Sequence, residues 1–548
     1  MARRTKIGII GGVFAGMLGV AGIGSYNIYT SLDSDAGGSH PQRANTSASA
    51  SVTAASLTRK EITDTADAFL TAWSSGRTAK AAGLTDSVQT ATAAFAGYAS
   101  DGHIGSVRIT PGAATADGER FTVTARVAYQ GLKSSWTYTS SLAVARNADS
   151  DPVVTWAPSV LHPDLADGDS LVTGLAQAPD VEVTDRNGTV LTADRYPSLA
   201  RIIDDLKERY GSRITGGTPG VETYVQKADG SAGKTLNVLR EGRGKRLTTT
   251  LDATVQTAAE NAVAGKSEAG VTALDTRSGA ILAVAYAPVS GTDRALMEDS
   301  APGSTFKIVT AAALLEHGMK PSSPAPCRSR DSAGHGGRMY RNDTDSLQNP
   351  NASLEWDFAQ SCNTGFIAQA DQLGGSGLRD TAEQFGLTKE WQVGTPTPDD
   401  QPNVPGGGAP DEMTSEMIGQ GQLRMSPLVM ASVAATASTG KFRQPRIVAQ
   451  RLIDGPPVTA GGISIQVSKD LRQMMRSTIT TGTAQKVMSG FGPDSGAKTG
   501  SAEVAGQSTT NGWFTAFAGH VAAAAIVHDA GHGNTTAGPI VAAVLSAS

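Results

Sequence analysis

Three short strings in the C-terminal half of the chain carry side chains suited to acyl transfer. They are Ser304-Thr305-Phe306-Lys307, Ser361-Cys362-Asn363 and Lys498-Thr499-Gly500. A serine hydroxyl becomes a nucleophile when a base takes its proton, and an amine three residues further along a helix lies on the same face and can reach it. Each string alone is a weak signal, but the three in this order form a signature of serine acyl transfer. The sequence therefore predicts that Ser304 forms a covalent acyl intermediate.

Lys307 must lose its charge before it can act as the base. Burial and a second nearby cation both lower the pKa of an amine, and Lys498 could be that cation. A turn at Ala301-Pro302-Gly303 and an apolar stripe over 308–317 predict a helix, with Ser304 near its positive N-terminal end. For the tetrad alone, a serine cap beside a solvated lysine is the alternative.

Length, charge and histidine placement limit the class of protein. The chain has 548 residues, which is enough for about two to four domains. Its formal net charge is −5 and it has no large basic block, so nucleic acid is not an expected partner. His528 and His532 are four apart and could bind zinc on a helix, but the string HDAGHGN is typical of a turn. We therefore expect no metal site and no cofactor.

The first 30 residues predict a membrane anchor. Basic residues precede an uncharged, glycine-rich apolar segment over roughly 7–23, a length that suits a signal peptide or a single membrane span. No convincing small-x-small cleavage site follows, which favours an uncleaved anchor over 1–30. The basic tip would stay in the cytoplasm and the rest would lie outside it. Residues 31–56 are rich in Ser, Ala, Gly and Thr and predict a flexible linker.

The rest of the chain divides into three regions, which together predict an α+β fold with several domains. Over 57–165, two helical stretches precede strand patterns, as in a small α+β domain. Residues 166–246 are interpreted as a connector, with a hairpin about Asn187-Gly188. Over 247–548, strand patterns near both ends, including a hairpin over 270–286, enclose helices. We expect an antiparallel sheet covered by helices there.

The region 247–548 resembles the transpeptidase domain of a class B penicillin-binding protein. The strings that carry the resemblance include TTTLDATVQTAAENAV, VTALDTRSGAILAVA, APGSTFK, SCNTGF, IGQGQLRMSPLVMA, TTGTA, KTGSAE and GWFTAFAG, all in family order. Residues 57–165 resemble, more loosely, the cone-like nuclear-transport-factor-2-like domain of methicillin-resistance-type members. The connector would then be a reduced dimerisation-like region. No glycosyltransferase domain fits before residue 247, so a bifunctional enzyme is not expected.

The resemblance implies a serine D,D-transpeptidase that cross-links peptidoglycan stem peptides and is acylated by β-lactams. Ser304 would attack the penultimate D-Ala carbonyl, Lys307 would be the base and Ser361 would relay the proton. The backbone N–H groups of Ser304 and Ser501 would form the oxyanion hole. The expected catalytic residues are Ser304, Lys307, Ser361 and Lys498. The expected substrate-binding residues are Asn363, Thr499, Gly500 and Ser501.

Other functions of the same fold stay open from sequence. A β-lactam hydrolase or sensor is one alternative, although no Glu-x-x-x-Asn string offers a second base between the last two motifs. A D,D-carboxypeptidase is a close variant, and a non-catalytic cell-wall scaffold is disfavoured by the intact motifs. The expected partners are stem peptides, β-lactams, the membrane through the N-terminal helix, and glycosyltransferase, elongation or division proteins.

The two cysteines leave a further alternative open. Cys327 and Cys362 would lie in an oxidising compartment, where a disulfide would tie the loop before the second motif to that motif. Two buried free thiols are the competing interpretation. With two cysteines in the chain, no larger disulfide framework holds the fold.

Overall fold

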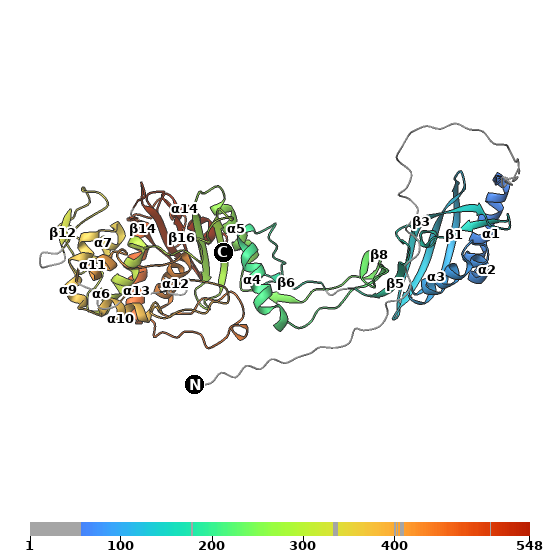
Figure 1. Ribbon diagram of the computed structural model, residues 1–548. Helices are drawn as coiled ribbons and strands as arrows, with labels where there is room; N and C mark the ends of the chain where they lie inside the picture. Colours follow the sequence, from blue (N-terminus) through green and yellow to red (C-terminus); the bar gives the residue numbers. More distant parts are fainter. Residues whose placement is uncertain are drawn as a thin grey trace, which may run out of the picture. The chain divides into compact units, whose positions relative to one another are not determined.

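The computed structural model describes residues 56–548 except 177–178, 333–337, 399–401, 403, 406–409 and 505. The chain divides into the units 1–57 and 58–548, and all elements below belong to the second unit (Figure 1). The predicted anchor over 1–30 and nearly all of the predicted linker lie outside the described residues. Among the described helices, none is long and apolar enough to cross a membrane.

The first domain places helices before a four-stranded antiparallel sheet, in the predicted order. A capping box between Thr58 and Glu61 begins the first helix. Phe69 and Trp73 from that helix are buried against Phe95 and Phe121. The sheet has the order β1-β2-β3-β4. The elements are α1 Arg59–Ser74, α2 Thr78–Ala82, α3 Val88–Ser100, β1 Ile104–Ala114, β2 Gly118–Tyr129, β3 Leu132–Arg146 and β4 Pro152–Thr155.

The connector contains more strand than the sequence predicts. A sheet with the order β5-β7-β8 joins segments far apart in sequence. The predicted hairpin about Asn187-Gly188 is present, since Thr184 and Val190 form an antiparallel bridge and the Leu191 nitrogen donates to the Val183 oxygen. The Asp185 carboxylate accepts the N–H groups of Asn187 and Thr189 and closes the tight turn. The strand before the turn, β6, also pairs in parallel with β9. The elements are η1 Pro158–Val160, β5 Ser170–Leu175, β6 Glu182–Thr184, η2 Pro197–Leu199, α4 Ala200–Tyr210, η3 Gly211–Arg213, β7 Val221–Gln226, β8 Ala232–Arg240 and β9 Arg246–Thr248.

A five-stranded antiparallel sheet forms the centre of the C-terminal region, as predicted. Its order is β11-β10-β16-β15-β14, and the expected hairpin over 270–286 is the β10–β11 pair. All residues of β16 are buried, because alternate side chains enter hydrophobic cores on opposite faces of the sheet. β14 is the last strand in this order, so β15 is its one neighbouring strand in the sheet. The strands are β10 Ala269–Asp275, β11 Ile281–Ala287, β14 Ser495–Ala502, β15 Asn511–Ala518 and β16 Val521–Val527.

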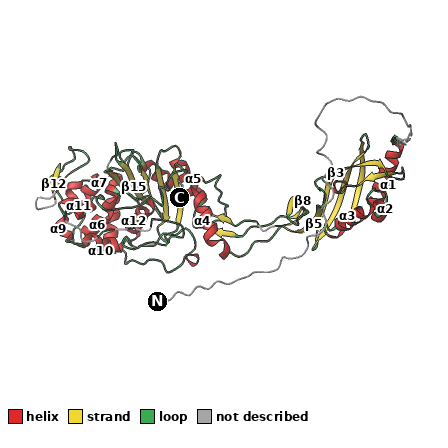
Figure 2. Cartoon of the chain, viewed as in Figure 1, coloured by secondary structure: helices red, strands yellow, loops and turns green. Residues whose placement is uncertain are grey.

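Helices pack against both faces of this sheet (Figure 2). On one face lie α5 and α14, and on the other lie α12 and α13 with α6 behind them. The helices are α5 Ala253–Val263, α6 Lys307–Glu316, α7 Leu354–Gln360, α8 Asn363–Ile367, α9 Ala370–Leu373, α10 Gly377–Gln384, α11 Pro410–Met417, α12 Pro427–Thr439, α13 Ile465–Thr480 and α14 Ala537–Ser546. Short elements are η4 Gly303–Phe306, η5 Gln450–Leu452, β12 Arg330–Ser332 and β13 Met339–Arg341.

Candidate active site

The nucleophile sits in a tight turn that leads straight into the helix. The predicted helix over 308–317 corresponds to α6, and Ser304 lies just ahead of it in η4. Gly303, with φ +54°, lets this turn approach β14, since a Cβ there would lie 2.8 Å from the carbonyl oxygen of Ser501. Gly500 of β14 permits the same close contact between β14 and the turn, because a Cβ there would lie 3.1 Å from the Thr305 nitrogen. The first and third motifs are thus in main-chain contact.

Lys307 is completely buried and directed at the second motif. Its Nζ donates to the backbone oxygen of Ser361 at 2.9 Å and to Oδ1 of Asn363 at 2.6 Å. Burial lowers the pKa of Lys307 to about 7. The amine can therefore lose its proton near neutral pH, as a base must.

Ser361 is hydrogen-bonded to both lysines and has an unusual backbone conformation. It ends α7 with φ +63°, a left-handed conformation that is uncommon outside glycine. Its backbone oxygen accepts from Lys307, while its hydroxyl accepts from Lys498 Nζ at 2.9 Å. Strained backbone of this kind persists where surrounding contacts hold it, often at functional sites.

Lys498 is as deeply buried as Lys307. Burial, and next the nearby Lys307, lower the pKa of Lys498 well below its ordinary value. Two amines bridged by one serine cannot both hold a charge in such a place at low cost. The pair is therefore expected to carry less positive charge than two surface lysines would.

The substrate-binding residues predicted from sequence lie on the same cavity or directly beside it. Ser304, Asn363 and Ser501 line a cavity of about 610 Å³. Thr499 and Gly500 directly precede the cavity-lining Ser501 on β14, and the Thr499 hydroxyl is hydrogen-bonded to the Thr483 hydroxyl at 2.6 Å. Among the described residues no hydrogen bond joins Ser304 Oγ to either lysine, and such contacts often tighten when substrate binds.

The cavity also includes residues that the sequence analysis did not assign to the active site. Arg341 is the last residue of β13 and Asp343 follows that strand, and the Asn363 side chain donates to the Arg341 backbone oxygen at 2.9 Å. His532 lies in the loop after β16, with Nδ1 3.3 Å from Ser501 Oγ. Strands of three residues leave no periodic signal, so no sequence pattern indicated this wall. Gln420 could have been noted, since it lies in the family string that begins at residue 418.

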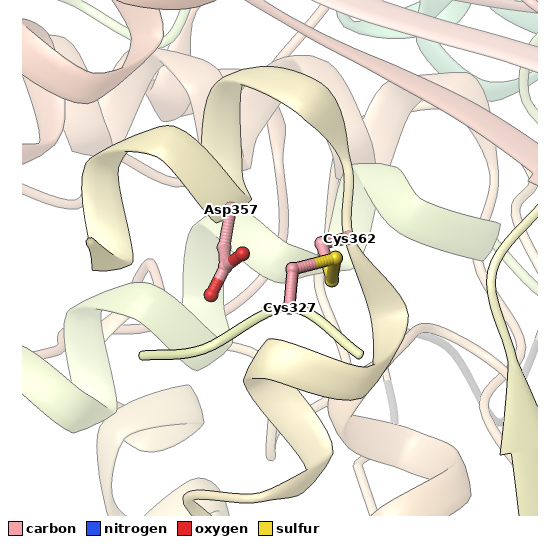
Figure 3. Close-up of side chains that lie close together, drawn as sticks. All are labelled: Cys327, Asp357 and Cys362. Atoms are coloured by element: carbon pink, nitrogen blue, oxygen red, sulfur yellow. A yellow bond between two sulfur atoms is a disulfide. The ribbon is translucent and has the colours of Figure 1, made fainter. Parts of the chain in front are cut away.

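The two cysteines form a disulfide, which decides between the alternatives left open by the sequence. The bond between Cys327 and Cys362 ties the loop before the second motif to the middle residue of that motif (Figure 3). In the described part of the chain, these sulfurs and the Asp357 carboxylate are the only group close enough together to suggest a metal site. Sulfurs bonded to each other are not thiolate ligands, so the group does not fit a metal.

The histidines that could have bound zinc have separate partners. His528 Nε2 lies 2.9 Å from the buried Glu298 carboxylate, which belongs to the segment ahead of the tetrad. His532 faces Ser501 in the cavity instead. Both lie beyond β16, in a loop rather than on a helix.

Comparisons with known proteins match most of the described chain. The family "Penicillin binding protein transpeptidase domain" matches residues 269–546, and "NTF2-like N-terminal transpeptidase domain" matches 61–169. The peptidoglycan D,D-transpeptidase PbpA of Mycobacterium tuberculosis is 28% identical over 377 residues, which cover 56% of this chain and 73% of the relative.

Solved structures agree in fold. The D,D-transpeptidase domain of a peptidoglycan glycosyltransferase from Eggerthella lenta aligns with TM-score 0.53 and 21% identity, over 68% of this chain and 98% of that one. A chain from a peptidoglycan synthase complex that coordinates polymerization and crosslinking aligns with TM-score 0.51 and 22% identity, over 70% and 92%.

Replacing Gly419 with alanine should destabilise the protein more than the matched change at Gly421. Both glycines have positive φ, which costs alanine about 1–2 kcal/mol. A Cβ at 419 would also lie 1.7 Å from the Gly303 backbone oxygen, whereas one at 421 would make ordinary contacts. Thermal unfolding should therefore show a loss of about 3 kcal/mol or more for Gly419→Ala. Equal losses in the two variants would contradict this packing.

The rate of Ser304 acylation should rise with pH through about 7, because the pKa of Lys307 is about 7 and its neutral form is the base. Lys307→Ala should lower that rate by roughly two to four orders of magnitude. Lys320→Ala, at an exposed lysine beyond the same helix, is the control and should leave it unchanged. Stopped-flow acylation by a chromogenic β-lactam measures both effects. A rate that is constant from about pH 6 to about pH 9 would contradict the assignment of Lys307.

Proposed function

The chain belongs to the penicillin-binding protein transpeptidase family, and we propose that it is a peptidoglycan D,D-transpeptidase acting through an acyl-enzyme on Ser304. One observation carries the proposal. Two buried lysines, one from α6 and one from β14, both hydrogen-bond to Ser361 beside the cavity that Ser304 lines. This arrangement supplies a neutral amine, a proton relay and a nucleophile in one place.

In the acylation step, Ser304 Oγ attacks the penultimate D-Ala carbonyl while Lys307 Nζ takes the hydroxyl proton. We assign the tetrahedral oxyanion to the backbone N–H groups of Ser304 and Ser501, an assignment supported by the close packing of η4 against β14. The C–N bond to the terminal D-Ala then breaks. The leaving amine takes a proton from the hydroxyl of Ser361, which Lys307 and Lys498 replenish.

The two lysines hold one proton between them in this scheme. Lys498 donates to Ser361 Oγ, and burial beside Lys307 keeps its pKa well below the ordinary value. Lys307 takes one proton from Ser304, and that proton can pass through the Ser361 hydroxyl. The buried pair therefore need not carry two positive charges at the same time.

Substrate recognition is assigned to the cavity face of β14 and to the second motif. We assign the terminal carboxylate to the hydroxyls of Thr499 and Ser501, with Gly500 allowing close approach of the strand. Asn363 binds the substrate amide with its side-chain nitrogen, while its oxygen is held by Lys307. An amine of a neighbouring stem peptide then attacks the acyl-enzyme, and β-lactams are trapped at the same stage.

The cellular setting is also a proposal. We place the catalytic domain outside the cytoplasm, anchored by residues 1–30, which agrees with the disulfide between Cys327 and Cys362. We keep the domain bounds 57–165, 166–246 and 247–548 for the first domain, connector and transpeptidase. A partner glycosyltransferase is proposed because a chain of a peptidoglycan synthase complex shares this fold.

Labelling with a fluorescent penicillin tests the assignment of Ser304. The wild type should form a stable covalent adduct, and Ser304→Ala should form none because the acylated oxygen is missing. Ser322→Ala, at an exposed serine, is the matched control and should label normally. Equal labelling of Ser304→Ala, or none of the wild type, would reject the nucleophile.

Product analysis separates the related activities. With a stem-peptide donor and an added amine acceptor, a transpeptidase gives the cross-linked amide and free D-Ala. Exclusive hydrolysis of the peptide would indicate a D,D-carboxypeptidase instead. Rapid loss of the penicillin label would indicate a β-lactam hydrolase.

A further inference from the structure

Asp357 is a buried carboxyl group that the mechanism above does not use. It lies on α7, one turn before Ser361, and its side chain is completely shielded from solvent. Among the described residues neither carboxylate oxygen has a hydrogen-bond partner. Unpaired buried carboxyl groups are rare in proteins because burial without a partner is unfavourable.

The surroundings of Asp357 leave space for a carboxyl group but offer it no donor. Gly365 lies against it, and a Cβ on that residue would be 2.0 Å from Asp357 Oδ2. The carboxyl therefore occupies the volume that a side chain at 365 would fill. On another side lies the disulfide, whose sulfurs are within 4.8 Å of the carboxylate and of each other (Figure 3). A disulfide carries no proton to donate, so nothing here stabilises the anion by a hydrogen bond.

The positive charge that stabilises the Asp357 carboxylate is that of Lys307. The backbone oxygen of Asp357 accepts from the Cys362 nitrogen, and Lys307 Nζ donates to the backbone oxygens of the same turn, at Ser361 and Cys362. Burial raises the pKa of Asp357 to about 8, and Lys307 opposes that rise. In turn Asp343 and Asp357 raise the pKa of Lys307 against the larger effect of its burial.

The charged groups that share this buried region come from four elements. They are Lys307 of α6, Lys498 of β14, Asp343 of the loop after β13 and Asp357 of α7. Asp343 lines the open cavity, whereas Asp357 lies behind the second motif, away from solvent. Asp357 is therefore the carboxyl whose charge water cannot screen.

We propose that Asp357 is a positioning residue for acylation, whose carboxyl group and the Lys307 amine together determine when that lysine is free to accept the Ser304 proton. Since the role concerns the step assigned above, it rests on the proposed function. An ionised carboxyl stabilises the Lys307 ammonium ion, so Lys307 then loses its proton only at higher pH. A protonated or absent carboxyl gives no such stabilisation, so Lys307 becomes neutral and competent at lower pH. During attack the serine proton moves to Lys307, and Asp357 keeps its own.

Asp357→Asn tests this role because it keeps the size of the side chain and removes its ionisation. Without a neighbouring carboxylate, Lys307 loses its proton at lower pH. The acid limb of the acylation rate should move to lower pH by up to about one unit, with rates converging at about pH 9. The measurement is the second-order acylation rate constant with a chromogenic β-lactam across that pH range.

A second replacement separates charge from packing. In Asp357→Ala/Gly365→Ala, the added methyl group at 365 fills part of the space that the carboxyl leaves, in case Asp357→Asn does not fold. An electrostatic role gives this double variant a shift toward lower pH like that of Asp357→Asn. Variants that lower the melting temperature but keep the wild-type acid limb would overturn the role and leave Asp357 as a packing residue.

The result also distinguishes this role from the proposed function. Acylation of wild-type Ser304 at about pH 9 establishes the nucleophile independently of Asp357. If wild type is acylated and the variants share its pH profile, only the role of Asp357 is rejected. If wild type is not acylated at any pH, the proposed function fails and the role of Asp357 fails with it.

Discussion

The active site of the C-terminal region depends on the burial of two lysine side chains beside the turn at Ser361. Lys307 and Lys498 are both completely buried, and an ammonium group in such a place is stable only with several acceptors around it. The turn at Ser361 provides them, with its backbone oxygens toward one lysine and its hydroxyl toward the other. Ser361 adopts a left-handed conformation in this turn, with its backbone oxygen toward Lys307 and its hydroxyl toward Lys498. The packing of α6, α7 and β14 fixes that geometry.

The chemistry of the site could be predicted because its residues lie in short strings whose spacing follows from helix and strand geometry. Ser304 and Lys307 are one turn apart, and Lys498, Thr499 and Ser501 belong to one edge strand. The fold of the same region was predictable as well, since buried strands such as β11 and β16 leave continuous apolar runs in the sequence.

What the sequence did not predict depends on tertiary contact between distant segments. His532 is 31 positions from Ser501, and only the return of the chain after β16 brings the two together. The hairpin about Asn187-Gly188 was predictable from its turn residues, but no local pattern indicated that β6 also pairs in parallel with the distant β9. No sequence pattern identified Asp357, because its carboxyl group fits its buried position only where the contact residue, Gly365, has no side chain.

The disulfide gives this site a maturation order. Cys362 stands between Ser361 and Asn363, so the covalent bond to Cys327 belongs to the catalytic motif itself. Disulfides form in oxidising compartments and are reduced in the cytoplasm of most cells. The second motif therefore acquires its final covalent framework after export. A chain still inside the cell would hold that motif by hydrogen bonds and packing alone, so the site is completed where its polymeric substrate is assembled.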